Sequence, residues 1–197
     1  MDQLNKIKVC FLISGYGTNL FKVLTNLKND KKRKFLPSVI ISNNKVRDDI
    51  KNISKKVNQK IKIYEDIKDL NIINFINTDL IFSIGYMKKI PKSIFQKYKT
   101  INLHPSLLPN YKGLMTHKRM LINNENLYGF SIHLVNGSID DGKILFQKSK
   151  KINNLNEESL IKAHKKLEYE NVYKALIEIC IVLDKFWATE EQSNFNR

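Results

Sequence analysis

The chain has few cysteines and no apolar run of the length that a membrane helix needs. It contains 197 residues, of which 42% are hydrophobic, and no run approaches the roughly 18 apolar residues of a spanning segment. The first apolar stretch is short, and a glycine turn follows it rather than a small-residue cleavage site, which argues against a secretory signal. We therefore expect a cytoplasmic protein with no membrane partner.

The two cysteines, Cys10 and Cys180, lie far apart in the sequence and in apolar company. This placement is typical of buried thiols in a reducing compartment rather than of a disulfide. No histidine, cysteine or carboxylate cluster has the spacing of metal ligands, so we expect no bound metal.

Negative charge is scarce relative to positive charge, and the formal net charge is +15. The lysines are spread along nearly the whole chain, and the densest cluster, residues 28–35, contains no interleaved aromatic side chains. Motifs of nucleic-acid-binding domains are missing, so we expect no nucleic-acid partner. Two interpretations remain open, a solvated surface of biased composition and a basic patch for anionic ligands. A basic protein favours a phosphorylated small substrate.

Apolar β-branched segments alternate with helical patterns along the first half of the chain. We expect strands at residues 7–14, 37–42, 61–66, 79–87 and 100–105, with helices between them. This order predicts an α/β fold with a doubly wound, mostly parallel, Rossmann-like sheet and helices on both faces.

The pattern then changes. Two strands, 128–135 and 143–152, flank a loop and predict an antiparallel pair, and a long helical segment follows, with Asn154 or Asn156 as its cap. Without a linker or repeat, we expect one domain over residues 1–187 and a frayed tail over 188–197.

Three stretches carry candidate chemistry. The first, "ISGYGTNL" (13–20), joins the first strand to a helix, which is where phosphate binds in such folds. It lacks the third glycine of a dinucleotide fingerprint, and no Gly-Lys-Ser/Thr of a P-loop follows. A small anion cradle built from Gly17, Thr18 and Asn19, or a bare tight turn, fits this stretch.

The second stretch, "INLHPSLLPN" (101–110), places Asn102 and His104 at the end of a buried strand. Residues i and i+2 of a strand face the same side, and ligands of open α/β sheets bind beyond the carboxyl ends of the strands. Asn can donate to an oxygen that develops negative charge, and His can move a proton near neutral pH. A structural strand-end histidine is the alternative.

The third stretch, "NGSIDDGK" (136–143), holds two adjacent carboxylates, Asp140 and Asp141, in a loop that also reads as an Asx-type hairpin turn. Among the other histidines, His117 is expected to face the same cleft as His104. His133 lies in a strand among apolar residues, which favours a packed or supporting role. His164 is expected at the surface of the last helix.

Together these motifs resemble the folate-dependent formyltransferases, and most closely the branch that acts on phosphoribosylglycinamide in purine synthesis. The resemblance covers most of the chain and rests on five runs: "LISGYGTNL", "DLIFSIGYMKKI", "INLHPSLLPNYKGLMTH", "YGFSIHLVNGSIDDGKILFQ" and, more weakly, "HKKLEYENVY". The Asn-x-His-Pro-Ser-Leu-Leu-Pro run is its most specific part. The chain departs from the family at Lys88, where an Arg is usual, and at Met115, where a His is common.

The resemblance implies roles for individual residues. The catalytic residues would be Asn102, His104 and Asp140, with Asp140 favouring the protonated form of His104. The residues that hold the ribose phosphate of the acceptor would be Gly17, Thr18, Asn19, Lys165 and Glu168. The folate pocket would be lined, largely through backbone groups, by Met87, Lys88, Lys89 and Ile90, with Asn102 beside it.

The resemblance implies that the chain transfers a formyl group from 10-formyltetrahydrofolate, a co-substrate, to the amine of 5'-phosphoribosylglycinamide. The nearest alternative is a sister enzyme that formylates a nucleotide-linked amino sugar. Methionyl-tRNA formyltransferase would need an RNA-binding domain for which the chain has no room. Formyl-folate hydrolases carry a different motif at this place in the sequence. The presence of Asn102, His104 and Asp140 together disfavours a non-enzymatic folate- or RNA-binding module.

Overall fold

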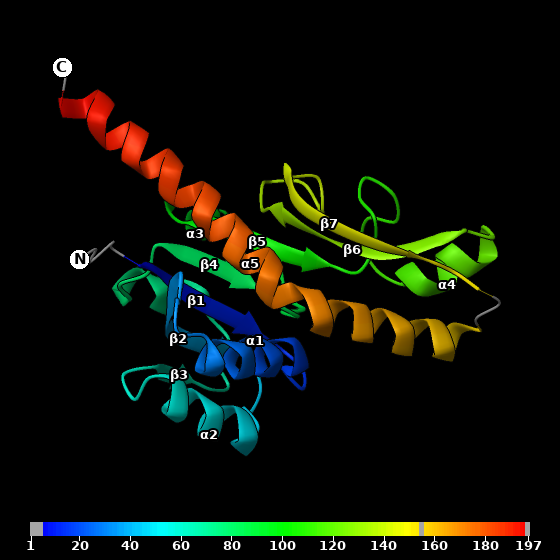
Figure 1. Cartoon of the computed structure of the whole chain (residues 1–197), viewed down its shortest axis with the longest axis horizontal. Helices are drawn as coiled ribbons and strands as arrows, with labels where there is room; N and C mark the ends of the chain where they lie inside the picture. The colour runs from blue at the N-terminus through cyan, green and yellow to red at the C-terminus, as the bar shows by residue number, and fades with distance from the viewer. Residues whose placement is uncertain (1–5, 154–155, 196–197) are drawn as a thin grey trace.

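A single seven-stranded sheet forms the centre of the protein in a computed structural model, which describes residues 6–153 and 156–195, with the side chains of the last helix described as far as Leu183 (Figure 1). The strand order is β3-β2-β1-β4-β5-β6-β7. Strands β1 to β5 pair in parallel, whereas β6 runs antiparallel to β5 and to β7. The expected mostly parallel, Rossmann-like sheet with an antiparallel pair near its end is confirmed.

The elements lie close to the expected positions. The strands are β1 (Ile7–Ile13), β2 (Phe35–Ser42), β3 (Lys62–Tyr64), β4 (Leu80–Ser83), β5 (Lys99–His104), β6 (Leu127–Leu134) and β7 (Ile144–Lys151). The helices are α1 (Thr18–Asn29), α2 (Asp48–Val57), a 3-10 helix η1 (Leu70–Phe75), α3 (Lys92–Lys97), α4 (Thr116–Ile122) and α5 (Glu157–Phe195).

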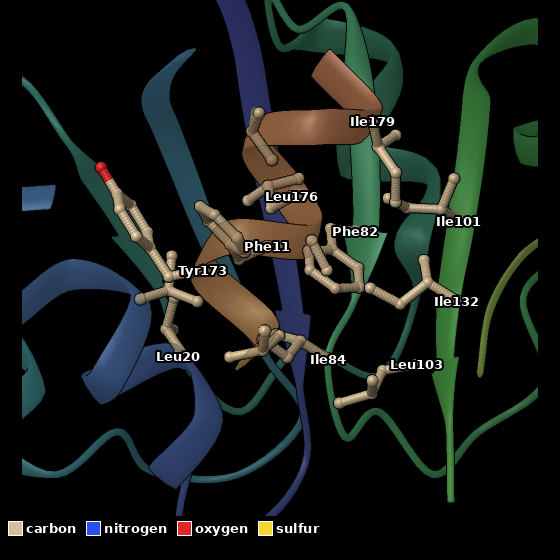
Figure 2. Packing of buried hydrophobic residues seen from close by; sticks show 14 of the residues in the cluster. Phe11, Leu20, Phe82, Ile84, Ile101, Leu103, Ile132, Tyr173, Leu176 and Ile179 are labelled. Atoms are coloured by element: carbon tan, nitrogen blue, oxygen red, sulfur yellow. The ribbon is translucent and has the colours of Figure 1, made fainter. Parts of the chain in front are cut away.

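Alternate side chains of the central strands enter two separate cores, as strands buried on both faces require. Phe11 and Phe82 lie on the face covered by α1 and α5, and their ring centroids are 6.1 Å apart. Figure 2 shows Leu176 and Ile179 of α5 packed over these strands. Neighbouring residues of a strand face opposite cores: Phe11 faces the first core, and Leu12 faces the second, which lies under η1 and α3.

Two segments differ from the expected pattern. The strand expected at 79–87 ends at Ser83, because Gly85 has a φ of 90° and turns the chain out of the sheet. Ile84 and Tyr86 remain buried, so their apolar character reflects packing in a loop. The connection between β3 and β4 contains a 3-10 helix instead of an α-helix.

Helix α5 begins as expected, since Asn156 Oδ1 accepts a hydrogen bond from the Ser159 N–H. Its backbone continues to Phe195 with no break at residue 187. The side chains of the tail lie outside the described residues, and the frayed tail over 188–197 stays a prediction. Cys10 and Cys180 are both buried and neither forms a disulfide. Within the described residues, every helix is too short or too polar to cross a membrane.

Gly17 occupies a position where a side chain would be strained. Its φ is +62°, and an added Cβ would lie 2.7 Å from Ile50 Cδ1 and 3.1 Å from Ile13 Cδ1. We expect Gly17→Ala to lower the free energy of unfolding by about 1–3 kcal/mol, because left-handed backbone and overpacking both cost stability. Urea unfolding of the purified chain measures this.

Gly15→Ala is the matched control, since a Cβ at Gly15 meets nothing within 4 Å. Its stability should stay within about 0.5 kcal/mol of wild type. Equal stabilities for the two variants would show that the left-handed turn before α1 is not strained by a side chain.

Candidate active site

A cavity of about 800 Å³ lies at the carboxyl ends of β4 and β5. Its walls come from the segment after β4, the loop before α4, the loop between β6 and β7, and one face of α5. This is the edge at which open α/β sheets bind ligands. The cavity therefore lies where the sequence placed Asn102 and His104.

Asn102 has its side-chain amide held in one orientation. Ser83 Oγ donates to Asn102 Oδ1 at 2.7 Å, and Asn102 Nδ2 lies 3.3 Å from His133 Nε2. His133 uses its Nδ1–H to donate to the backbone oxygen of Leu134 at 2.9 Å, so its Nε2 can accept from Asn102. The amide oxygen is thus occupied, and the second N–H of Asn102 is left as a donor for an oxygen in the cavity.

His104 is buried, and both of its ring nitrogens face acceptors. Its Nε2–H donates to the backbone oxygen of Tyr111 at 2.9 Å, and its Nδ1 lies 3.2 Å from Asp140 Oδ2. Burial lowers the pKa of His104 below 6.5, although the Tyr111 carbonyl and the Asp140 carboxylate oppose this shift. Asp140 acts in the expected direction, but burial outweighs it, and the ring is neutral near pH 7.

Asp140 sits in a tightly folded loop against the end of β6. Its φ is 49°, a left-handed conformation that Asp tolerates better than most residues. A Cβ at Gly142 would lie 1.7 Å from the Leu134 carbonyl oxygen, so only glycine lets the loop approach the strand this closely.

The Asp140 carboxylate lies among several polar groups. The Gly113 N–H donates to Oδ2 at 2.9 Å, and His133 Nε2 lies 3.4 Å from Oδ1. Burial alone would raise the pKa of Asp140, but the contact with His133, the hydrogen bond from Gly113 and the nearby His104 lower it below 3.8. Asp140 is therefore an ionised carboxylate. The adjacent Asp141 points away and pairs with Lys112.

The residues expected to hold the ribose phosphate are brought together only in part. Asn19, Lys165 and Glu168 line the cavity, whereas Gly17 and Thr18 begin α1 without lining it. Asn19 Nδ2 donates to Glu168 Oε2 at 2.8 Å and ties α1 to α5. Burial raises the pKa of Glu168 to about 7, with Asn19 and Lys165 acting against it.

The segment expected to line the folate pocket, Met87 to Ile90, does line the cavity. The backbone N–H of Met87 is already used, because it donates to Ser14 Oγ at 2.7 Å. Across the cavity, Leu114, Met115 and Ile139 expose 73%, 65% and 74% of their surface. Apolar side chains this exposed at a cavity wall suit a flat organic ligand.

One histidine, His164, lies elsewhere than the sequence suggested. His164 is 1% exposed, not at the surface, and its Nδ1 lies 2.6 Å from His117 Nε2. The periodicity of the buried residues Leu160 and Leu167 already places position 164 on the inner stripe of α5. His133 is buried as expected, yet it contacts Asn102 and Asp140 directly. His117 lines the cavity as expected.

His133 could have been found from the pairing of strands. It stands opposite Asn102 in the antiparallel register of β5 and β6, and directly opposed residues interact across strands. Within residues 6–153 and 156–183, no group of three or more His, Cys, Asp and Glu side chains is arranged to hold a metal ion.

The chain resembles known proteins over most of its length. It is 28% identical over 150 residues to the phosphoribosylglycinamide formyltransferase of Haemophilus influenzae, a match that covers 71% of each chain. It is 29% identical over 159 residues to the trifunctional purine biosynthetic protein adenosine-3 of Gallus gallus, covering 75% of this chain and 16% of that longer protein.

Solved structures agree. The phosphoribosylglycinamide formyltransferase of Anaplasma phagocytophilum superposes with a TM-score of 0.77 and 26% identity, covering 89% of this chain and 87% of the other. The model of the Formyl transferase family matches residues 7–178, a range that contains every residue of the cavity described above. The chain therefore belongs to the Formyl transferase family.

Proposed function

We propose that this protein transfers the formyl group of 10-formyltetrahydrofolate to the amine of 5'-phosphoribosylglycinamide, a step of purine biosynthesis. The observation that carries the proposal is the cluster of Asn102, His104 and Asp140 in the wall of a cavity large enough for two small ligands. The reactants are small molecules, which fits a cytoplasmic enzyme with no nucleic-acid substrate.

Formyl transfer needs an oxyanion stabilised and a proton moved, and the cluster offers groups for both. The amine nitrogen attacks the formyl carbon, and the formyl oxygen becomes an oxyanion that the free N–H of Asn102 can bind. An oxyanion-hole donor of this kind is worth roughly 3 kcal/mol in the transition state. The fixed amide orientation set by Ser83 and His133 prepares Asn102 for this role.

His104 is suited to carry the proton. Its Nε2–H is committed to Tyr111, so Nδ1 is the position that can accept the proton lost by the attacking amine. Asp140 beside Nδ1 stabilises the resulting imidazolium. The C–N10 bond then breaks, the proton passes to N10, and the products are tetrahydrofolate and the formylated amine.

Two parts of the cavity wall suit the two substrates. Asn19, Lys165 and Glu168 offer a cation and hydrogen-bonding groups beside the N-terminus of α1, whose dipole favours a phosphate. The apolar wall at Leu114, Met115 and Ile139 suits the ring system of a folate. A nucleotide-linked amino sugar would use the same cluster, and it is the alternative acceptor.

Acceptor-dependent turnover is the first test. With 10-formyltetrahydrofolate and phosphoribosylglycinamide, we expect the absorbance of deformylated folate to grow only when both substrates are present. Turnover with a nucleotide amino sugar instead would replace the acceptor. Loss of the formyl group at the same rate without any acceptor would contradict a transferase.

Asp140 and Asp141 provide a matched pair for testing the cluster. Asp140→Asn removes the charge beside His104 and keeps the size of the side chain, so we expect kcat to fall at least about 100-fold. Folate binding, measured by fluorescence quenching, should be nearly unchanged.

Asp141→Asn is the control, because Asp141 is half exposed and faces Lys112 outside the cavity. It should keep a kcat within about twofold of wild type. If Asp140→Asn stays as active as Asp141→Asn, the assigned role of Asp140 is wrong.

A further inference from the structure

His117 and His164 form a pair in the wall of the cavity and take no part in the chemistry proposed above; His164 is buried, and His117 is partly exposed. His117 Nε2, on α4, lies 2.6 Å from His164 Nδ1, on α5, with ring centroids 4.7 Å apart. The ring of Tyr128 lies 5.9 Å from that of His164. Because His164 is only 1% exposed, its side of this contact is shielded from water.

The pair continues into a chain of polar groups that ends at α1. His164 Nε2 lies 3.6 Å from Glu168 Oε1, and Glu168 Oε2 accepts from Asn19 Nδ2 at 2.8 Å. His164 Nε2 itself is buried and makes no hydrogen bond in the structure. A buried nitrogen without a partner is rare, and Glu168 Oε1 is the nearest group described as facing it.

A single proton fits between the two rings. If His117 Nε2 donates it, His164 Nδ1 accepts, and neutral His164 carries its own proton on Nε2, facing Glu168. If His164 Nδ1 donates instead, His164 Nε2 is bare and can only accept from Glu168. The first arrangement suits a carboxylate at Glu168, and the second suits a carboxylic acid.

We propose that His117 and His164 are positioning residues for Glu168, and that the tautomer of His164 is coupled to the protonation state of Glu168 and to its hold on the acceptor. The last part rests on the proposed function, in which Glu168 lies at the ribose end of the cavity. A carboxylate accepts hydrogen bonds from two sugar hydroxyls, whereas the acid form offers one donor and fewer acceptor positions.

The charges around this chain of groups favour a change of tautomer over a change of charge at His164. Burial, with His117 and His104 nearby, lowers the pKa of His164 to about 3. His164 is therefore neutral at every pH of interest. Burial raises the pKa of Glu168 to about 7, with Asn19 and Lys165 opposing. Glu168 is thus the group that titrates near neutrality.

Other charged groups also act on the pKa values of His117 and Glu168. Burial also lowers the pKa of His117, with Glu157 raising it and Lys165 lowering it. Among the groups that influence Glu168, α1 contributes the neutral side chain of Asn19, and α5 contributes Lys165. Acceptor binding is therefore expected to be strongest above the pKa of Glu168 and to weaken as the pH falls through that pKa.

Imidazole ¹⁵N NMR tests the coupling without any substrate. The chain has four histidines, so single variants assign every ring. From about pH 8.5 to about pH 6, we expect the proton of His164 to move from Nε2 to Nδ1, and we expect no such movement in Glu168→Gln. A His164 tautomer that ignores both pH and Glu168→Gln would overturn the proposal.

Steady-state kinetics tests the consequence for the acceptor. His164→Leu should raise the KM for phosphoribosylglycinamide about tenfold with little change in kcat, and should alter the pH dependence of KM. His164→Gln, which keeps an N–H toward Glu168, should restore part of the loss. Lys162→Gln, an exposed change on the same helix, should match wild type.

The two tests fail separately. A wild-type KM and pH profile in His164→Leu would remove the positioning role even if the enzyme is a transferase. Absence of turnover with phosphoribosylglycinamide in the wild-type chain would contradict the proposed function alone, and the NMR titration would still decide the coupling between His164 and Glu168.

Discussion

The partly buried carboxylate of Asp140 is the group on which the rest of the site depends. A charge with this little exposure to water is stable only when polar groups surround it. Here those groups come from separate segments: the Gly113 N–H before α4 donates to the carboxylate, and the rings of His104 at the end of β5 and His133 on β6 lie against it. One carboxylate thus fixes the loop between β6 and β7, the loop before α4 and both rings. The geometry that Asn102 needs follows from the position of His133.

The topology of the sheet brings the residues around Asp140 together. Parallel strands bring their carboxyl ends to one edge, and there the early turns after β4 and β5 open a cavity rather than a packed surface. The antiparallel β6 then returns beside β5 and places His133 opposite Asn102. Helix α5 closes the remaining side and joins the core to the cavity, since its buried stripe carries Leu160 and Leu167 as well as His164 and Glu168. Helix α5 therefore contributes both to the stability of the core and to the site.

Much of this arrangement could be predicted from local sequence. Period-two alternation and apolar runs are sufficient for the strands, and the strand-end position of Asn102 and His104 predicted a common face. The resemblance to the formyltransferases selected Asp140 over Asp141, and Asp140 is the carboxylate that lies beside His104. The strand after residue 79 was predicted too long, because apolar residues such as Tyr86 pack in a loop as well as in a strand. The histidine pair required knowing that α4 and α5 meet, and that contact is set by tertiary packing.

The ionisation of Asp140 tests this account most directly. Carboxyl ¹³C NMR, with the Asp140 signal assigned through Asp140→Asn, follows its protonation in the folded chain. The account predicts a pKa below 3.8, because the interactions with His133, Gly113 and His104 outweigh the effect of burial. A pKa above that value would mean that burial dominates. The carboxyl would then be no fixed negative charge for His104, and the proposed proton transfer would lose its basis.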